Sequence, residues 1–349
     1  MNSNTAAFQP DSRLRGNGRK CASVLEPPIG ANLGRVTHRQ DWLMHRRILP
    51  ERLNLAIARR CDVACGGCYT FFGRSEPDLA KFLSSVSVFI GLGLSDVTLS
   101  GGDPLTLLGL VGFLALLRSV GVRSIKLDTV GVGLVTQPQR AGTTLGDLIK
   151  SADYLGIPLD GWSDESALEF RRGRDRIFTE TVALLDAFDA VGDVPKLIVN
   201  TVAHRGNVNV LDRLYQELVR HSCICQWNVF QYTPTDQAER GANARYAVSD
   251  DAFAIGRERF FAHLAAAHRP ALPFVIDFRT TRSRLGQYLL VNSDGEAWLP
   301  DNSGRTMRLG SIFGREQEVL DDWSETVGAL LDPPRVQDAM RRVVLPAKA

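Results

Sequence analysis

The stretch that decides the fold is LNLAIARRCDVACGGC, residues 53–68. Its first residues are apolar and predict a buried strand, and its second half places Cys61, Cys65 and Cys68 on one short loop. Thiolates are the usual ligands of iron–sulfur clusters, and a four-iron cluster takes four ligands. Three thiolates therefore leave one iron open for chemistry. A structural zinc site is the alternative, although zinc favours a fourth Cys or His at local spacing and none lies near this loop.

A second motif, VTLSGGDPL, occupies residues 97–105. It predicts a short strand that ends at Gly101 and Gly102, and two glycines allow a backbone to come close to a ligand. Asp103 adds a carboxylate acceptor, and Pro104 ends the turn before a helical run. A GGDP sequence alone indicates only a turn. Because it stands one strand–helix unit after a CxxxCxxC loop, it indicates a second part of the same site.

The two motifs together resemble the signature of the radical S-adenosylmethionine (SAM) superfamily. In that family three cysteines hold a [4Fe–4S] cluster, SAM chelates the open iron, and a GGEP motif receives the SAM amino group. Here Asp103 replaces the commoner Glu and keeps its charge. The resemblance covers residues 50–235. It implies two cofactors, the [4Fe–4S] cluster and SAM, and an external electron donor of the flavodoxin or ferredoxin type.

From residue 53 onward, apolar strand patterns alternate with helical ones, which argues for parallel strands joined by crossover helices. The predicted strands are 53–58, 96–100, 124–129, 154–159, 196–202 and 226–232. The predicted helices are 77–92, 106–120, 142–152, 174–190, 208–222 and 249–268. Spacing alone does not separate an open sheet from a barrel. The resemblance implies an α/β fold with a partial (β/α)6 TIM-type barrel, whose active site lies at the C-terminal ends of the strands.

The chain divides into three predicted regions. Residues 1–48 form an N-terminal extension whose first ~20 residues are predicted to be disordered. Residues 49–272 form the radical SAM barrel, and residues 273–349 form a C-terminal capping region. In the capping region two alternating runs predict strands, and Asp294-Gly295 predicts a β-hairpin turn. This region contains no cysteine, which counts against the auxiliary clusters of many peptide-modifying family members.

The resemblance also implies cofactor contacts at other strand ends. It assigns them to Tyr69, Thr129, Asp160, Arg205 and Phe230, in addition to Gly101, Gly102, Asp103 and Pro104. An arginine fork suits the carboxylate of SAM, whereas the plainer interpretation of Arg205 is a solvated loop charge. Asp160 is equally suited to capping its own turn, and Phe230 to packing in the core.

The predicted substrate contacts are Asn200, Asn228 and Arg282. The fifth and sixth strands resemble the viperin-like branch and, more distantly, the molybdenum-cofactor cyclase. The viperin pattern has lysines at the positions of Ile198 and Asn228, so their absence predicts a substrate without a triphosphate. We expect a lyase of nucleoside antibiotic biosynthesis that decarboxylates a cytosylglucuronic-acid-like substrate, since some antibiotic pathways use a radical SAM enzyme of similar size for this reaction. The alternatives are a peptide-modifying radical SAM enzyme, a viperin-like nucleotide dehydratase, and a non-catalytic iron–sulfur or zinc-binding interaction protein.

The composition narrows the class of protein. With 349 residues, 44% of them hydrophobic, the chain can bury a substantial core. The net charge of +2 does not indicate a nucleic-acid partner, and no apolar run reaches the roughly 18 residues of a membrane span. Cys21, Cys223 and Cys225 are scattered, which is not a disulfide framework. We therefore expect a cytoplasmic enzyme with a small-molecule substrate and neither a nucleic-acid nor a membrane partner.

Overall fold

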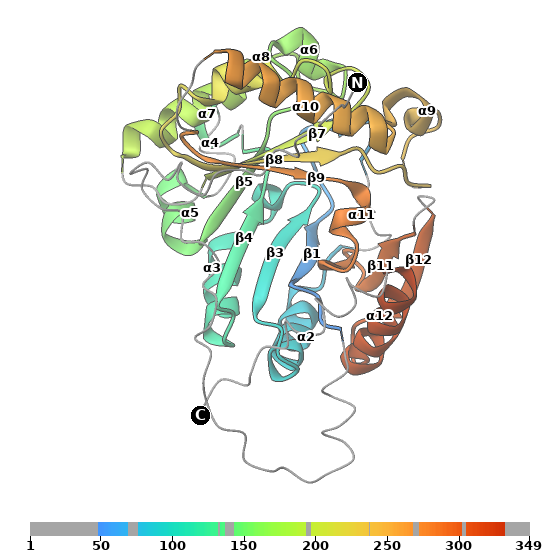
Figure 1. The fold of residues 1–349 in the computed structure, drawn as a ribbon. Helices are drawn as coiled ribbons and strands as arrows, with labels where there is room; N and C mark the ends of the chain where they lie inside the picture. The colour runs from blue at the N-terminus through green and yellow to red at the C-terminus, as the bar shows by residue number, and fades with distance from the viewer. Residues whose placement is uncertain are drawn as a thin grey trace, which may run out of the picture.

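A ten-stranded sheet flanked by helices makes up most of the molecule (Figure 1). The computed structural model describes residues 48–68, 76–131, 133–136, 143–192, 197–236, 238–267, 272–301 and 305–331. The predicted N-terminal extension therefore lies outside the described residues, apart from Ile48. No helix of the described part of the chain is long and apolar enough to cross a membrane.

Eight strands of the sheet are parallel and lie in the order β10-β1-β3-β4-β5-β7-β8-β9. Their bounds are β1 Arg52–Ala58, β3 Asp96–Gly101, β4 Ser124–Asp128, β5 Tyr154–Pro158, β7 Leu197–Ala203, β8 Ile224–Gln231, β9 Val275–Arg279 and β10 Tyr288–Val291. The six central strands are β1, β3, β4, β5, β7 and β8, and they coincide with the six predicted strands.

The crossover helices also lie where the sequence pattern predicts them. They are α2 Leu79–Gly91, α3 Leu110–Ser119, α5 Leu145–Ser151, α7 Ile177–Val191, α8 Leu211–Leu218 and α10 Asp250–Ala266. Four shorter segments lie between them: η1 Pro104–Thr106, α4 Gly133–Thr136, α6 Asp164–Leu168 and α9 Ala242–Tyr246. Because each central strand is followed by helix before the next strand begins, the predicted partial (β/α)6 architecture is confirmed.

The barrel is not closed by backbone pairing among the described residues, since β9 and β10 lie at the two ends of the parallel strand order. A side-chain contact joins these two strands instead: Arg279 donates from Nη1 to the hydroxyl of Tyr288 at 2.8 Å. Between them, α11 (Thr281–Arg284) lies at the C-terminal end of β8. Arg284 donates to the carbonyl of Gln231 there, at 2.8 Å. This short segment of the predicted capping region therefore contacts the C-terminal end of β8.

The predicted hairpin extends the sheet beyond β10. It joins β10 to β11 (Glu296–Pro300), and the antiparallel β12 (Thr306–Ser311) follows. Gly295 stands in the turn with a φ of +82°, a conformation that glycine adopts without strain. The last described helix, α12 (Glu316–Leu330), buries Trp323 in the main core.

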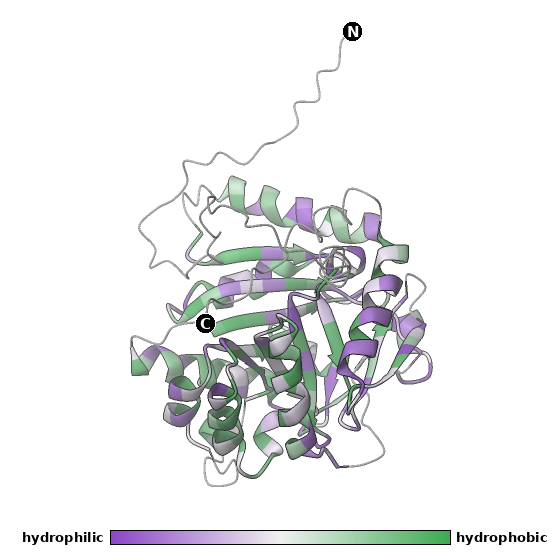
Figure 2. Ribbon diagram, turned by 90° about the horizontal axis from the view of Figure 1, so that it is seen from below, coloured by the Kyte–Doolittle hydropathy of each residue, from purple (hydrophilic) through white to green (hydrophobic). Residues whose placement is uncertain are grey.

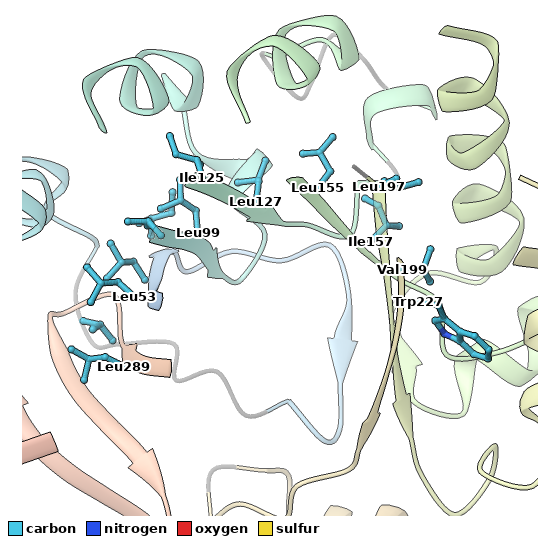
Figure 3. Packing of buried hydrophobic residues seen from close by; sticks show 14 of the residues in the cluster. Leu53, Leu99, Ile125, Leu127, Leu155, Ile157, Leu197, Val199, Trp227 and Leu289 are labelled. Atoms are coloured by element: carbon cyan, nitrogen blue, oxygen red, sulfur yellow. The ribbon is translucent and has the colours of Figure 1, made fainter. Parts of the chain in front are cut away.

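The two faces of the parallel sheet differ in chemistry because side chains alternate along a strand. Figure 3 shows Leu99, Leu127, Val199 and Trp227 on the face toward the helices, and all four are fully buried. We call this the helix-covered face. Figure 2 shows that hydrophobic and hydrophilic residues occur along both the strands and the helices. The opposite face, which we call the inner face, carries polar side chains such as Asn54 in β1 and Asn200 in β7.

Candidate active site

The cysteine loop leaves the C-terminal end of β1 and is held in place by a short second sheet. In that sheet β2 (Ala64–Cys65) pairs with β6 (Arg171–Arg172) in antiparallel register, so that Cys65 lies opposite Arg171. The amide of Cys68 donates to the carbonyl of Cys65 at 3.2 Å, which closes a tight turn. The three thiols are free and partly buried. One loop therefore presents all three predicted ligands at the end of one strand.

Glycine is required within this loop because aromatic rings lie directly against it. A Cβ atom at Gly67 would lie 2.5 Å from a ring carbon of Tyr232 and 2.8 Å from one of Phe170. These rings belong to a small buried cluster with Tyr246 that packs partly on Cys65. The contact holds the cysteine loop against the barrel.

Burial disfavours the ionised form of two of the three thiols. Burial raises the pKa of the Cys61 thiol to about 12, and burial likewise raises the pKa of Cys65. A metal deprotonates the thiols that coordinate it, so a cationic cluster meets this cost. Among the described residues no three His, Cys, Asp or Glu side chains converge on a point that suits one metal ion. A cubane takes each thiolate on a different iron and does not need that convergence.

The glycine pair after β3 packs against the start of the cysteine loop. A Cβ atom at Gly102 would overlap the carbonyl of Arg60, and one at Gly101 would overlap the carbonyl of Ala58. In this close approach the amide of Gly102 donates to the carbonyl of Ala58 at 2.7 Å, and the amide of Asp103 donates to the carbonyl of Arg60 at 2.5 Å. The glycines thus allow the two predicted motifs to join through their backbones.

Asp103 connects the same corner to the end of β4. One carboxylate oxygen accepts from the hydroxyl of Thr129 at 2.5 Å and from the amide of Leu105 at 3.0 Å. The other accepts from the amide of Val130 at 3.1 Å. Burial raises the pKa of Asp103 despite these bonds. Pro104 follows at the start of η1 and is itself buried. The structure therefore brings together four predicted cofactor contacts, Gly101 to Pro104, with a fifth at Thr129.

Asp160, at the end of β5, is fully engaged with the protein. Its side chain is 0% exposed and pairs with Nε of Arg171. Its second oxygen accepts from the amide of Val202 at 2.6 Å. A second guanidinium nitrogen of Arg171, Nη1, donates to the sulfur of Cys65 at 3.4 Å. Sequence reasoning missed Arg171, because it lies far from Cys65 along the chain and belongs to no motif.

Three other predicted contacts, Phe230, Arg205 and Arg282, lie outside the corner formed by the cysteine loop and the glycine pair. Phe230, on the inner face of β8, lies under two guanidinium groups, those of Arg284 at 5.2 Å and Arg279 at 5.8 Å from the ring centre. Arg205 and Arg282 are exposed to solvent. Tyr69 lies outside the described residues.

A chain of hydrogen bonds crosses the inner face from β8 to β4. Nε2 of Gln226 donates to Asn228 at 2.6 Å, Asn228 donates to Asn200 at 2.9 Å, and Asn200 donates to Asp128 at 3.3 Å. Lys126 forms an ion pair with the same oxygen of Asp128 at 2.8 Å. We call these five residues the polar chain. Two of them, Asn200 and Asn228, were predicted substrate contacts.

Gly156 allows the polar chain to pass over β5, which lies between β4 and β7. Asp128 is in register with Gly156. A Cβ atom at Gly156 would overlap the carboxylate of Asp128 and would lie 2.8 Å from the amide nitrogen of Asn200. Lys126, Asp128 and Gln226 were not predicted from the sequence, since only the strand register shows that they meet Asn200 and Asn228.

His204 follows β7 and is a packing residue in this structure. Its ring stacks on Phe170 with centroids 5.2 Å apart, and it is 1% exposed. Its Nδ1 accepts from the amide of Gly206 at 3.1 Å, while Nε2 has no hydrogen-bond partner among the described residues. Burial lowers the pKa of His204.

Comparison with known proteins gives both sequence relatives and structural neighbours, although no family model matches the sequence. A GTP 3′,8-cyclase of Caulobacter vibrioides is 30% identical over 205 residues, which is 57% of this chain and 56% of that protein. A GTP 3′,8-cyclase of Pseudomonas syringae is 28% identical over 173 residues, which is 47% of this chain and 49% of that protein. The chain thus spans about half the length of the curated relatives it matches.

Two solved radical SAM structures share the fold. Streptococcus suis SuiB bound to S-adenosylmethionine aligns with a TM-score of 0.59 at 14% identity, covering 86% of this chain and 70% of that one. The protein anSMEcpe with bound AdoMet aligns with a TM-score of 0.55 at 13% identity, covering 81% and 84%. This chain is therefore similar in part of its sequence to GTP 3′,8-cyclases and in its fold to these two radical SAM structures. The structural likeness shows the fold and leaves the substrate open.

Proposed function

We propose that this protein is a radical SAM enzyme that removes a hydrogen atom from a nucleoside or sugar acid. In this proposal Cys61, Cys65 and Cys68 hold a [4Fe–4S] cluster, and the corner formed by Asp103 and Thr129 receives SAM. One observation carries it: the cysteine loop and the glycine pair join through backbone hydrogen bonds at the C-terminal ends of adjacent parallel strands. That edge is where parallel α/β barrels place their active sites.

Bound together, the cluster and SAM would supply a 5′-deoxyadenosyl radical when an external donor of the flavodoxin or ferredoxin type provides one electron. The part of this chain is to position the reactants and keep water away. Asp103 is 3% exposed, and its three donors hold its carboxylate in one orientation. A SAM ammonium group would share the Asp103 carboxylate or bind the carbonyl groups that the glycine pair presents beside it.

The inner face supports a substrate of low charge. Lys126 is paired with Asp128, and Arg279 is paired with Asp277 at 2.7 Å. The remaining members of the polar chain are neutral amides, which suit the donors and acceptors of a nucleobase or sugar. Ile198, at one position where the viperin pattern has a lysine, is 7% exposed. A triphosphate needs several converging cations, whereas these two cations are already neutralised within their own strands.

The specific reaction we propose is decarboxylation of a cytosylglucuronic-acid-like substrate. The bond between the ring carbon and the carboxylate breaks, carbon dioxide leaves, and one proton from solvent takes its place, so the net reaction is redox neutral. The hydrogen atom removed at the start is replaced by one electron from the external donor and one proton from solvent, so 5′-deoxyadenosine accumulates. The guanidinium of Arg284, 5.2 Å from the ring centre of Phe230, is the group we propose for the carboxylate.

A second candidate is chemistry on a nucleoside triphosphate, because the curated relatives are named GTP 3′,8-cyclase. Peptide modification has weaker support: one title names SuiB bound to precursor peptide SuiA, and that 14% identity shows a shared fold alone.

The test is to reconstitute the protein with iron and sulfide without oxygen, add SAM and dithionite, and measure 5′-deoxyadenosine with four compounds at equal concentration. They are cytosylglucuronic acid, GTP, cytidine triphosphate and a short peptide. We expect the sugar acid to stimulate most, with carbon dioxide formed in proportion to substrate consumed. Stimulation by a triphosphate alone would establish the second candidate. Stimulation by the peptide alone would move the protein to the peptide-modifying enzymes. The Asn200→Ala variant should lose stimulation while still binding the cluster.

A further inference from the structure

A buried arginine reaches the sulfur of one proposed cluster ligand. Nη1 of Arg171 donates to Sγ of Cys65 at 3.4 Å, while Nε pairs with Asp160. The contact is built by the two-residue ladder between β2 and β6, in which these two residues are directly opposite. The same ladder fixes the neighbouring pair, Ala64 and Arg172.

Arg171 is held from several sides. Its side chain is 15% exposed, and its guanidinium lies 5.8 Å from the ring centre of Phe170. Its partner Asp160 is fixed in turn by the amide of Val202 at 2.6 Å, and Asn207 donates to the carbonyl of Asp160 at 2.9 Å. Contacts from β7 and from the loop that follows it thus hold Asp160, and Asp160 in turn orients one N–H bond of Arg171 toward one sulfur.

We propose that Arg171, oriented by Asp160, sets the reduction potential of the cluster through its hydrogen bond to Cys65. The inference rests on the proposed function, since it needs the cluster on Cys61, Cys65 and Cys68. Adding an electron makes the thiolate sulfurs more negative, so a cationic donor on one of them stabilises the reduced state. Partial burial strengthens this effect because little water screens the charge. Asp160 acts in the opposite direction as a negative charge, and also as the group that holds Arg171 in place.

The neighbouring residue provides a matched control. Arg172 belongs to the same strand and carries the same charge, but its guanidinium pairs with Glu239 and is 41% exposed. Removing either arginine changes the net charge by one unit. Of the two, only Arg171 has a hydrogen bond to a cysteine sulfur within the described part of the chain. A difference between the two variants therefore measures the local hydrogen bond rather than the overall charge.

The experiment is a redox titration of the reconstituted full chain, followed by electron paramagnetic resonance of the reduced cluster. In Arg171→Gln we expect the ratio of reduced to oxidised cluster at a fixed potential to fall about tenfold, a shift of about 59 mV for one electron. Arg172→Gln should leave the ratio unchanged. Arg171→Lys, which keeps the charge but lacks the fork, should fall between wild type and Arg171→Gln.

Asp160→Asn keeps the test decisive if Arg171→Gln fails to fold or to hold the cluster. It is isosteric, and its amide oxygen still accepts from Nε of Arg171, so it removes a negative charge while keeping Arg171 in place. The ratio of reduced to oxidised cluster should therefore rise. An equal shift in Arg171→Gln and Arg172→Gln, or a fall in Asp160→Asn, would overturn the inference and leave the proposed function intact. A wild-type protein that takes up no cluster would overturn the proposed function and this inference together.

Discussion

The helix-covered face and the inner face of the sheet are built by the same strands but serve different ends. In β8, Trp227 and Asn228 are consecutive residues whose side chains lie on opposite faces of the sheet. Trp227 lies among buried aromatic rings, with Phe260 5.5 Å away, and its indole N–H donates to Thr201 at 2.8 Å. Asn228 lies on the other face, within the polar chain. One step along the strand changes the role of a residue from core packing to presentation of polar groups.

The difference indicates that the helix-covered face stabilises the fold and that the inner face presents the polar groups available for chemistry. The helix-covered face is a continuous apolar cluster that runs from Leu53 in β1 to Trp323 in α12. The inner face holds its polar groups through side-chain bonds between strands, and each of those bonds joins residues that are distant in sequence. Substitutions on the first face should therefore change stability, and those on the second should change activity.

The largest expected effect is at the cysteine loop, which begins at the C-terminal end of β1. Cys61→Ala, Cys65→Ala and Cys68→Ala should each abolish cluster binding and SAM cleavage, because the proposed cubane has no ligand to spare. Cys223→Ala and Cys225→Ala should retain both, since these thiols lie on β8 or just before it, far from the loop in sequence. Iron content and 5′-deoxyadenosine formation are the measurements. Normal iron content in any one of the three loop variants would contradict the assignment.

The pair Trp227→Ala and Asn228→Ala tests the two faces directly. Trp227→Ala should lower the free energy of unfolding by about 3–5 kcal/mol, because it leaves a large cavity in the core. Asn228→Ala should cost about 1–3 kcal/mol through the unpaired oxygen of Asn200, yet it should reduce substrate-dependent 5′-deoxyadenosine formation more strongly. Urea unfolding and the activity assay give the two readouts. The contrast between the faces fails if both variants lose stability and activity in the same proportion.

Gly156→Ala sharpens the comparison by adding one methyl group to the inner face. The methyl would displace Asp128 and break its bond to Asn200. A hydrogen bond to a charged group contributes about 1.5–3 kcal/mol, so kcat/KM for the substrate should fall about tenfold or more. The control is Gly112→Ala, on an exposed turn of α3 where an added Cβ meets nothing within 4 Å. That variant should leave kcat/KM unchanged. An unchanged kcat/KM in Gly156→Ala would mean that the polar chain does not position the substrate.

The helix-covered face and the glycine motif were predictable from the sequence because their signals are local. Alternation in 53–58 and 96–100 predicts β1 and β3, and the requirement for glycine at Gly101 and Gly102 follows from the motif itself. The physical reason for the glycines was only partly foreseen. They approach the backbone of Ala58 and Arg60, whereas the sequence predicts an approach to a ligand.

The polar chain and the arginine at Cys65 were not predictable in the same way. Lys126, Asp128 and Gln226 resemble ordinary strand-end polar residues until the register of four strands places them together. Arg171 lies on a two-residue strand that carries no periodic pattern at all. Such contacts are long-range in sequence, and one chain without relatives aligned to it holds no local signal for them.

The smallest expected effect concerns His204, a buried polar group near the strand ends that we assign to structure alone. Burial lowers its pKa, and Arg171 and Arg245 act in the same direction, while Asp160 and Glu169 oppose them. The unfolded chain therefore binds a proton near pH 6.5 that the folded chain resists. Stability contributed by His204 is present above that pH and is lost as the pH falls, with a slope of at most about 1.4 kcal/mol per pH unit.

His204→Phe, which preserves the stacking on Phe170, should reduce the loss of unfolding free energy between pH 7.5 and pH 5. Urea unfolding at several pH values measures this, and 5′-deoxyadenosine formation at pH 7.5 should stay close to wild type. An identical pH dependence in the two proteins would show that His204 is protonated as readily in the folded state as in the unfolded one, and a large loss of activity would place it in the site instead.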